Sequence, residues 1–126
     1  MSQHKWLEYK HWAIVGASTK EESYGNKIIK RLLSAGYDAV PIANKHDVVE
    51  GLKAYKALSD YEGEIDVVNF VVNPQIGLGV LDDVIAKGVK RILLQPGTSS
   101  DALIAKAEAA GIEVLQSCVL VLLAWK

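Results

Sequence analysis

The segment from Ile65 to Val72 constrains the fold more than any other part of this chain, because it is almost continuously apolar. A strand with one wet face alternates apolar and polar side chains, whereas an unbroken apolar run fits a strand that is buried on both faces. Such strands occur in parallel sheets that helices cover on each side. The segment therefore predicts a sheet that lies between two helical layers.

The rest of the chain alternates between strand-like and helix-like patterns. Apolar residues at helical spacing, such as Ile28, Ile29 and Leu32, predict amphipathic helices, and a glycine directly after each pattern is suited to end the helix. This alternation is typical of an open, mostly parallel sheet. We expect strands at 12–15, 38–43, 65–72, 91–94 and 112–115, and helices at 25–35, 74–87 and from 99 or 100 to 110.

The expected fold is therefore a single α/β domain over residues 1–126, with a Rossmann-like three-layer arrangement and a mostly parallel sheet of about five strands. A chain of 126 residues is long enough to bury one core of this kind. Residues 1–11 form a lead-in with a short helix over 5–10. Pro41 lacks a backbone N–H, so we expect an irregular or bulged spot in the second strand.

Charge and cysteine content narrow the classes of partner and compartment. The formal net charge is −1, so no global positive field attracts nucleic acid or an anionic membrane, and we expect neither as a partner. The single cysteine, Cys118, cannot form an internal disulfide, and residues 1–11 lack the apolar segment of a signal peptide. We therefore expect a cytoplasmic protein.

The apolar run Val119–Trp125 needs burial, although it is far too short to span a bilayer. Two alternatives are open. The run covers the core as a last strand or helix, or it packs against a second subunit. The second alternative predicts a homodimer or a complex with a partner protein.

Polar and glycine-containing segments follow the expected strands at their carboxyl ends, where parallel sheets bind ligands. They are Gly16-Ala17-Ser18, Asn44-Lys45, Asn73-Pro74 and Gln95-Pro96-Gly97. Turns use the same residue types, so each segment could be a simple turn. The first segment is the most informative, because a second glycine, Gly25, opens the next helix and lets backbone N–H groups approach a phosphate.

The first loop departs from the dinucleotide fingerprint, because Gly16 and Gly25 enclose a longer loop than the spacing G-x-G-x-x-G allows. The second strand ends in Asn44-Lys45, without the acidic residue that accepts hydrogen bonds from the ribose of NAD. A lysine at that place suits a phosphate on the ribose. These features favour a ribose-phosphorylated nucleotide over NAD.

An ordered set of motifs from about Trp12 to Cys118 resembles the small CoA-binding domain family, which is related to the N-terminal domain of the succinyl-CoA synthetase α subunit. The motifs are Ile14-Val15-Gly16-Ala17-Ser18, Gly25, Leu32 to Gly36-Tyr37, Val40-Pro41-Ile42-Ala43-Asn44, Gly51-Leu52-Lys53-Ala54-Tyr55, Ile65-Asp66-Val67-Val68, Asn73-Pro74, Gly88-Val89-Lys90, Gln95-Pro96-Gly97, Ala110-Gly111-Ile112 and Ser117-Cys118.

This resemblance implies a binding site for coenzyme A in which the loop after the first strand holds the phosphates. The ends of the second and third strands line the nucleotide site. Family members often have Asn-Pro where this chain has Asn44-Lys45, so the rim of the site differs here. The implied CoA-binding residues are Gly16, Ala17, Ser18, Tyr24, Gly25, Asn26, Asn44, Lys45, Val72, Asn73 and Pro74. We expect valine at Gly16 or Gly25 to weaken CoA binding by at least about tenfold, or 1.4 kcal/mol.

No catalytic constellation is visible, and we expect neither a catalytic residue nor a metal site. His4, His11 and His46 have no neighbour in sequence that would activate them, and the acidic pairs Glu21-Glu22 and Asp82-Asp83 do not form a metal-ligand pattern. Cys118 is interpreted as a small buried residue at the end of the last strand, so we expect Cys118→Ser to leave CoA affinity within a few-fold. The alternative is a thiol near the pantetheine end of CoA that forms a mixed disulfide with it.

The preferred functional hypothesis is a domain that binds CoA or an acyl-CoA without chemistry of its own. One alternative is a regulatory or oxidoreductase-like module that binds NADP or another nucleotide. The other is an accessory subunit that requires a partner protein to form an acyl-CoA ligase.

Overall fold

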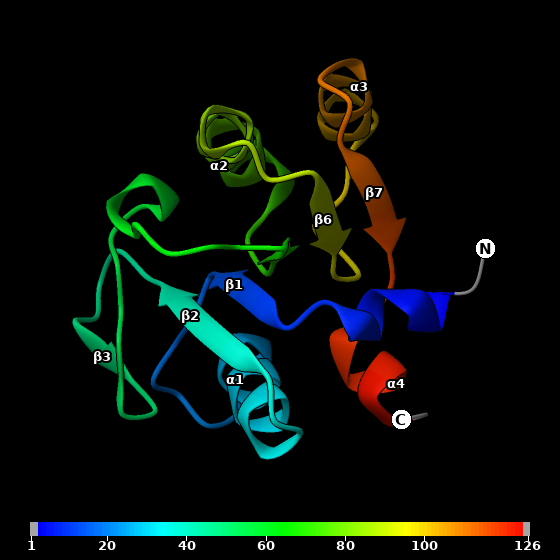
Figure 1. The fold of residues 1–126 in the computed structure, drawn as a ribbon. Coiled ribbons are helices and arrows are strands. Elements are labelled where there is room, and N and C mark those ends of the chain that lie inside the picture. Colours follow the sequence, from blue (N-terminus) through cyan, green and yellow to red (C-terminus); the bar gives the residue numbers. More distant parts are fainter. Residues whose placement is uncertain (1–2, 125–126) are drawn as a thin grey trace.

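The computed structural model describes residues 3–124 and shows an α/β fold (Figure 1). Five strands form the main sheet: β1 (His11–Val15), β2 (Asp38–Ile42), β5 (Val67–Phe70), β6 (Arg91–Leu94) and β7 (Glu113–Gln116). The helices are α1 (Tyr24–Ser34), α2 (Pro74–Lys87), α3 (Asp101–Ala109) and α4 (Val119–Ala124). Short elements complete the fold: the 3-10 helices η1 (Gln3–Glu8) and η2 (Leu58–Asp60), and the hairpin of β3 (Val48–Val49) and β4 (Leu52–Lys53).

The main sheet has the strand order β2-β1-β5-β6-β7, and all four pairings are parallel. β1 is paired along its length on both edges: Ala13, for example, lies opposite Val40 of β2 and Val68 of β5. The chain passes from β1 through α1 to β2 at one edge and then returns to β5 on the other side of β1. Strand order therefore reverses at β1. The predicted mostly parallel sheet of five strands is confirmed.

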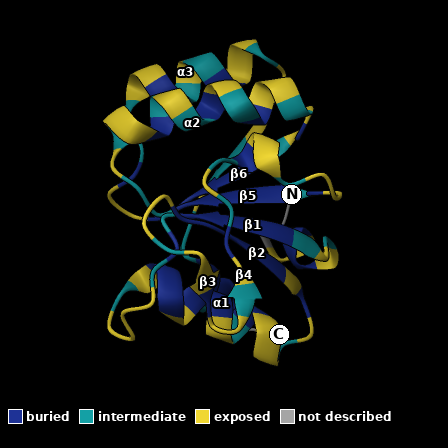
Figure 2. Cartoon of the chain, turned by 90° about the vertical axis from the view of Figure 1, so that its left-hand side faces the viewer, coloured by how far each residue is buried: buried dark blue, intermediate teal, exposed yellow. Residues whose placement is uncertain are grey.

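Helices cover both faces of the sheet, which gives the three layers that the sequence predicts (Figure 2). Along β1, Trp12 and Ile14 point into the core beneath α1, α4 and η1, whereas Ala13 and Val15 point into the core beneath α2 and α3. Because successive side chains of a strand point to opposite faces, one short strand contributes to both cores. Because both faces of such a strand are buried, its sequence is almost continuously apolar.

Local sequence determines where the helices begin. Ser23, Asn73 and Ser100 each precede a helix, and the side-chain oxygen of each accepts a hydrogen bond from a backbone N–H of the first turn. Pro74 occupies the first turn of α2, where its missing N–H costs nothing. Gly88 ends α2 with a φ of 80°, a left-handed conformation that favours glycine.

Several expectations require correction. β5 spans only Val67–Phe70 within the predicted 65–72. The predicted irregularity at Pro41 is wrong: Pro41 pairs regularly with Ile14, and β2 is the edge strand of the main sheet, so no neighbouring strand requires the missing N–H. The lead-in contains a 3-10 helix at Gln3–Glu8, and His11 already belongs to β1. The β3–β4 hairpin and η2 were not predicted at all.

The apolar run at the C-terminal end forms α4, which packs against α1 and η1. Val119, Leu122 and Leu123 are buried there, and the Arg31 guanidinium donates a hydrogen bond to the carbonyl oxygen of Leu123 at 3.2 Å. The described part of this run therefore covers the core as a helix, which is the first of the two alternatives. Trp125 lies outside the described residues. No helix within residues 3–124 has the length and apolar character of a membrane span.

Two glycines in α2 provide a matched test of core packing. A Cβ on Gly79 would meet no atom within 4 Å, so Gly79→Ala should raise the free energy of unfolding by about 0.5–1 kcal/mol, the usual gain in helix propensity. A Cβ on Gly77 would lie 2.8 Å from Cδ1 of Leu103 and 3.3 Å from Cδ2 of Phe70. Gly77→Ala should therefore gain less or be destabilising. Chemical denaturation measures both, and equal stabilisation would contradict close packing of α2 on α3.

Candidate functional site

Two adjoining clefts lie at the carboxyl ends of the strands. The first cleft, of about 480 Å³, is lined by the ends of β1 and β2, the loops that follow them, and the side of α2. The second cleft, of about 320 Å³, is lined by segments that follow β5, β6 and β7, and by Tyr24 at the start of α1. Val72 belongs to the walls of both clefts. The clefts therefore meet where strand order reverses, the usual position of ligands in open α/β sheets.

The loop from Gly16 to Ser23 forms one side of the first cleft. Gly16 turns the chain away from β1 with a φ of 98°, and the backbone N–H groups of Gly16 and Ala17 both donate to the carbonyl oxygen of Ile42. The backbone N–H groups of Ser18 and Thr19 make no hydrogen bond to any residue between 3 and 124. Free N–H groups beside the start of α1 provide a positive environment that suits an anion.

The side chain of Asn26 fixes this loop by hydrogen bonds. Its side chain is fully buried, and its amide nitrogen donates to the carbonyl oxygen of Ser18 and to a carboxylate oxygen of Glu50, each at 2.9 Å. Glu50 is in the β3–β4 turn and has a φ of 50°. One buried amide thus connects the loop after β1 with the turn of the hairpin. The shape of the loop is determined by the protein itself.

Gly25 also helps to determine the shape of the loop, because only a glycine fits at this position. A Cβ at this position would lie 2.4 Å from the carbonyl oxygen of Gly16 and 3.2 Å from Cα of Ala17. The first turn of α1 therefore packs directly on the backbone of the loop. A Cβ on Gly16 would in turn lie 2.9 Å from the carbonyl oxygen of Val71. Valine at either glycine would disturb the fold of the loop before any ligand is considered, so the predicted loss of binding would not by itself identify a phosphate site.

Basic side chains gather at the rim of the first cleft. Lys20, Lys45, His46 and Lys56 line it together with a single carboxylate, Asp83. Lys56 is engaged with the carbonyl oxygen of Asn44 at 3.2 Å and with the Asp47 carboxylate at 3.5 Å. Lys20 and Lys45 form no ion pair with any described residue. The wall is apolar where Val15, Ile42, Ala43, Val72, Ile76 and Val80 approach the cleft.

The second cleft combines a thiol with a buried amide. Gln95 is 4% exposed, and its amide nitrogen donates to Sγ of Cys118 at 3.3 Å. The amide oxygen of Gln95 accepts from the backbone N–H of Val119 at 2.8 Å and from the side-chain amide of Asn69 at 3.2 Å. These two donors fix which way the amide points. Cys118 is half-buried and lines the cleft, so the interpretation of this residue as a buried end of the last strand is wrong.

The predicted site residues divide into three groups. Gly16, Ala17, Ser18, Asn44 and Lys45 line the first cleft, Tyr24 and Asn73 line the second, and Val72 lines both. Gly25, Asn26 and Pro74 line neither cleft, and the structure places them where they support the loop or begin α2. The expected site residues did not include Lys20, His46 and Lys56 of the first cleft or Thr98 of the second, and Gln95 was named only as part of a polar segment after a strand. Lys20, His46 and Thr98 lie in the loops that follow β1, β2 and β6, and extending the search along those loops could have identified them.

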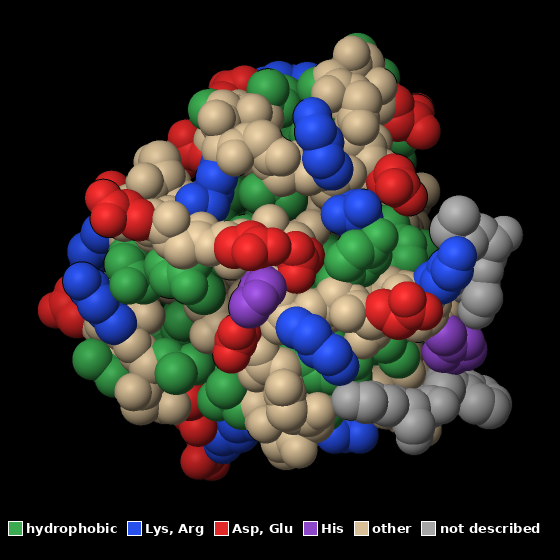
Figure 3. Space-filling view, viewed as in Figure 1, with side chains coloured by type: hydrophobic (Ala, Val, Ile, Leu, Met, Phe, Trp, Pro, Cys, Tyr) green, Lys and Arg blue, Asp and Glu red, His purple; other side chains and the backbone are tan. Residues whose placement is uncertain are grey.

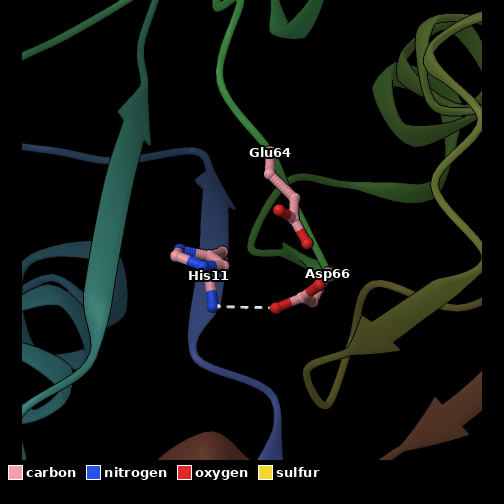
Figure 4. Close-up of side chains that lie close together, drawn as sticks. All are labelled: His11, Glu64 and Asp66. Carbon is pink, nitrogen blue, oxygen red and sulfur yellow. Dashed lines mark hydrogen bonds between the residues drawn. The ribbon is translucent and has the colours of Figure 1, made fainter.

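One further cluster of polar side chains lies away from the clefts. At the other end of the sheet, His11, Glu64 and Asp66 have potential ligand atoms within 4.8 Å of one another (Figure 4). The His11 ring already pairs with Asp38 at 2.8 Å, and the Asp66 carboxylate accepts from the backbone N–H of His11 at 3.2 Å. These contacts connect the starts of the strands. Acidic and basic side chains are mixed over the visible face (Figure 3), in agreement with the net charge of −1.

The contact between Gly25 and Gly16 generates a stability prediction. Gly25→Ala should lower the free energy of unfolding by about 1–3 kcal/mol, because the new Cβ collides with backbone atoms that cannot rotate away. Gly79→Ala is the matched control, since that glycine is also helical but has open space around it. Thermal or denaturant unfolding compares the two variants. A Gly25→Ala protein as stable as the parent would show that the loop and α1 are not packed together.

Comparisons with known proteins were consistent with one another. The sequence model of the CoA binding domain family matches residues 10–124. Over 87 residues, or 68% of this chain, the sequence is 38% identical to the ADP-forming acetate–CoA ligase of Methanocaldococcus jannaschii, of which the match covers 12%. The chain thus spans a small part of that curated relative.

Solved structures agree with the fold. A conserved hypothetical protein from Pyrococcus furiosus aligns with a TM-score of 0.86 and 37% identity, over 90% of this chain and 98% of that chain. The dinucleotide-forming acetyl-coenzyme A synthetase 1 of Ca. Korarchaeum cryptofilum aligns with a TM-score of 0.76 and 32% identity, over 86% of this chain and 26% of that chain. The same fold therefore occurs both as a small protein and as one part of a larger one.

Proposed function

The chain belongs to the CoA-binding domain family, and from that premise we propose that it binds coenzyme A or an acyl-CoA at the two clefts, without catalysing a reaction itself. The observation that supports this most is the adjacency of a first cleft of about 480 Å³ with lysines at its rim and a smaller second cleft of about 320 Å³ along one edge of the sheet. CoA has the same division, since a phosphorylated nucleotide is joined to a thin pantetheine arm.

The first cleft suits the nucleotide. The free N–H groups of Ser18 and Thr19 would donate to the diphosphate, and the apolar wall would cover the base. Lys45 would meet the phosphate on the ribose, because it follows β2, where NAD-binding sheets have an acidic residue. Lys20 and Lys45 have no described ion-pair partner, so both are available to an anionic ligand.

The clefts provide little for catalysis. The described hydrogen-bond partner of the Cys118 sulfur is the amide of Gln95, which cannot act as a base. His46 lies at the rim of the first cleft and has no carboxylate partner among the described residues. A nucleophile and a base within hydrogen-bond distance are required for acyl transfer. We therefore assign to the two clefts a role in binding and orienting the ligand.

Thermal unfolding with added ligands tests the proposal. CoA at about 100 times its dissociation constant should stabilise the protein by about 2.7 kcal/mol, whereas NAD should stabilise it weakly or not at all. Dephospho-CoA should stabilise less than CoA at equal concentration, because the phosphate on the ribose is missing. Equal shifts with CoA, NAD and NADP would instead support the alternative of a general nucleotide-binding module.

A pair of lysine variants locates the ligand. Lys45→Ala should weaken CoA binding by about three- to tenfold in calorimetric titration, since a charge-assisted hydrogen bond to phosphate is lost. Lys90→Ala is the control, because Lys90 is exposed and precedes β6 at the opposite end of the sheet. With dephospho-CoA, Lys45→Ala should have little effect. A loss that is equal for both ligands would contradict the assignment of Lys45 to the ribose phosphate.

A second candidate function is an accessory role in an acyl-CoA ligase. The observation that favours it is that similar sequences form a minor part of much larger ligases, 12% of one and 26% of another. In that case the chain would bind CoA in the same clefts, and another polypeptide would supply the catalytic residues. Co-purification with a partner that confers CoA-dependent ligase activity would support this candidate over the first.

A further inference from the structure

We propose that Cys118 captures the ligand covalently, as a mixed disulfide between its sulfur and the thiol of coenzyme A. The inference rests on the proposed function and assigns a modification to a residue that noncovalent binding does not need. It starts from the second cleft, which is lined by Cys118, Gln95 and Thr98. A ligand with its nucleotide in the first cleft would reach the second cleft past Val72, which lines both clefts.

Gln95 provides an independent indication that the second cleft receives a polar ligand. Gln95 is 4% exposed and lines the second cleft. Its amide oxygen accepts hydrogen bonds from the backbone N–H of Val119 and the side-chain amide of Asn69. The amide nitrogen has two N–H groups, of which only one is used within residues 3–124, toward Sγ of Cys118. The second N–H has no described acceptor, and an acceptor on a ligand in the second cleft would supply one.

The same contacts define what Cys118 can do. Its sulfur accepts a hydrogen bond from an amide whose orientation is fixed by two other donors. No second cysteine exists in the chain, so an intramolecular disulfide cannot compete. The thiol is half-buried and lines the second cleft, so a reacting sulfur approaches it most directly from within that cleft. A sulfur carried by a bound ligand satisfies that condition.

The chemistry is thiol–disulfide exchange with the disulfide of CoA. The Cys118 thiol loses its proton to solvent, and the thiolate attacks one sulfur of the CoA disulfide. The S–S bond of the reagent breaks as the new S–S bond forms, and the second CoA leaves as a thiolate that takes up a proton. Cys118 is oxidised and the departing CoA is reduced. The product is the protein with one CoA attached, and thiol reductants reverse the reaction.

Mass spectrometry of the intact protein measures the reaction. Wild-type protein is incubated with CoA disulfide or with glutathione disulfide at equal concentration. Because binding in the clefts raises the effective concentration of the reacting sulfur, the CoA adduct should form at least about tenfold faster than the glutathione adduct. Lys45→Ala should slow the reaction with CoA disulfide and leave that with glutathione disulfide unchanged, since Lys45 belongs to the first cleft.

Two variants complete the design. Cys118→Ser should form no adduct and should retain noncovalent CoA affinity within a few-fold. Adding Ser34→Cys to that variant places an exposed thiol at the end of α1, away from both clefts, and this thiol should react equally with the two disulfides. Equal rates with both disulfides in the wild-type protein would overturn the inference. If Cys118→Ser binds CoA, that outcome leaves the proposed function intact, whereas loss of noncovalent CoA binding in the folded wild-type protein overturns both.

Discussion

β1 lies between β2 and β5 and pairs with both in parallel, while its two faces are buried under different helical layers. A strand enclosed in this way can leave the sheet only at its ends. The loop that follows Val15 must therefore emerge beside the ends of β2 and β5, where strand order reverses. Both clefts lie at this point, and the helices that cover the sheet also determine the directions in which the loops depart.

Two small polar networks then fix the loops to one another. Asn26 connects the loop after β1 with Glu50 of the hairpin, and Gln95 connects Asn69 in the centre of the sheet with the start of α4. Each network is centred on a buried amide side chain that bonds a backbone group as well as another side chain. In an interior of low dielectric, such bonds are strong when they are made and costly when one partner is removed. The walls of the clefts consequently derive their positions from the core beneath them.

Most of the fold could be predicted from the sequence, because burial on both faces leaves a direct mark on residue type. The runs at 91–94 and 74–87 match the observed elements, and Ser100, one of the two serines predicted as a possible cap, caps α3. The β3–β4 hairpin could not be predicted, since its strands are too short for a period to be visible. Pro41 was misjudged because the sequence does not show which strand lies at an edge.

The candidate site was harder to predict than the fold. Residues next to strand ends, such as Ser18 and Lys45, were found because their neighbourhood follows from topology. Lys56 was missed, because a lysine in a loop has no distinctive pattern until its neighbours in space are known, and Gln95 was noted as a strand-end residue without the contacts that its amide makes. Gly25 was found for an incomplete reason. The sequence suggested room for phosphate, whereas the structure shows close contact with the carbonyl of Gly16.

That contact between Gly25 and Gly16 has a consequence for the thermodynamics of recognition. A loop that is already held by its own helix, by Asn26 and by the carbonyl of Ile42 loses little conformational entropy when a ligand arrives. The conformational entropy of the loop is already lost on folding, so ordering this loop does not reduce the affinity for a ligand. For the proposed CoA ligand, such a preformed loop predicts an occupancy that follows the concentration of free ligand without a prior conformational change of the loop.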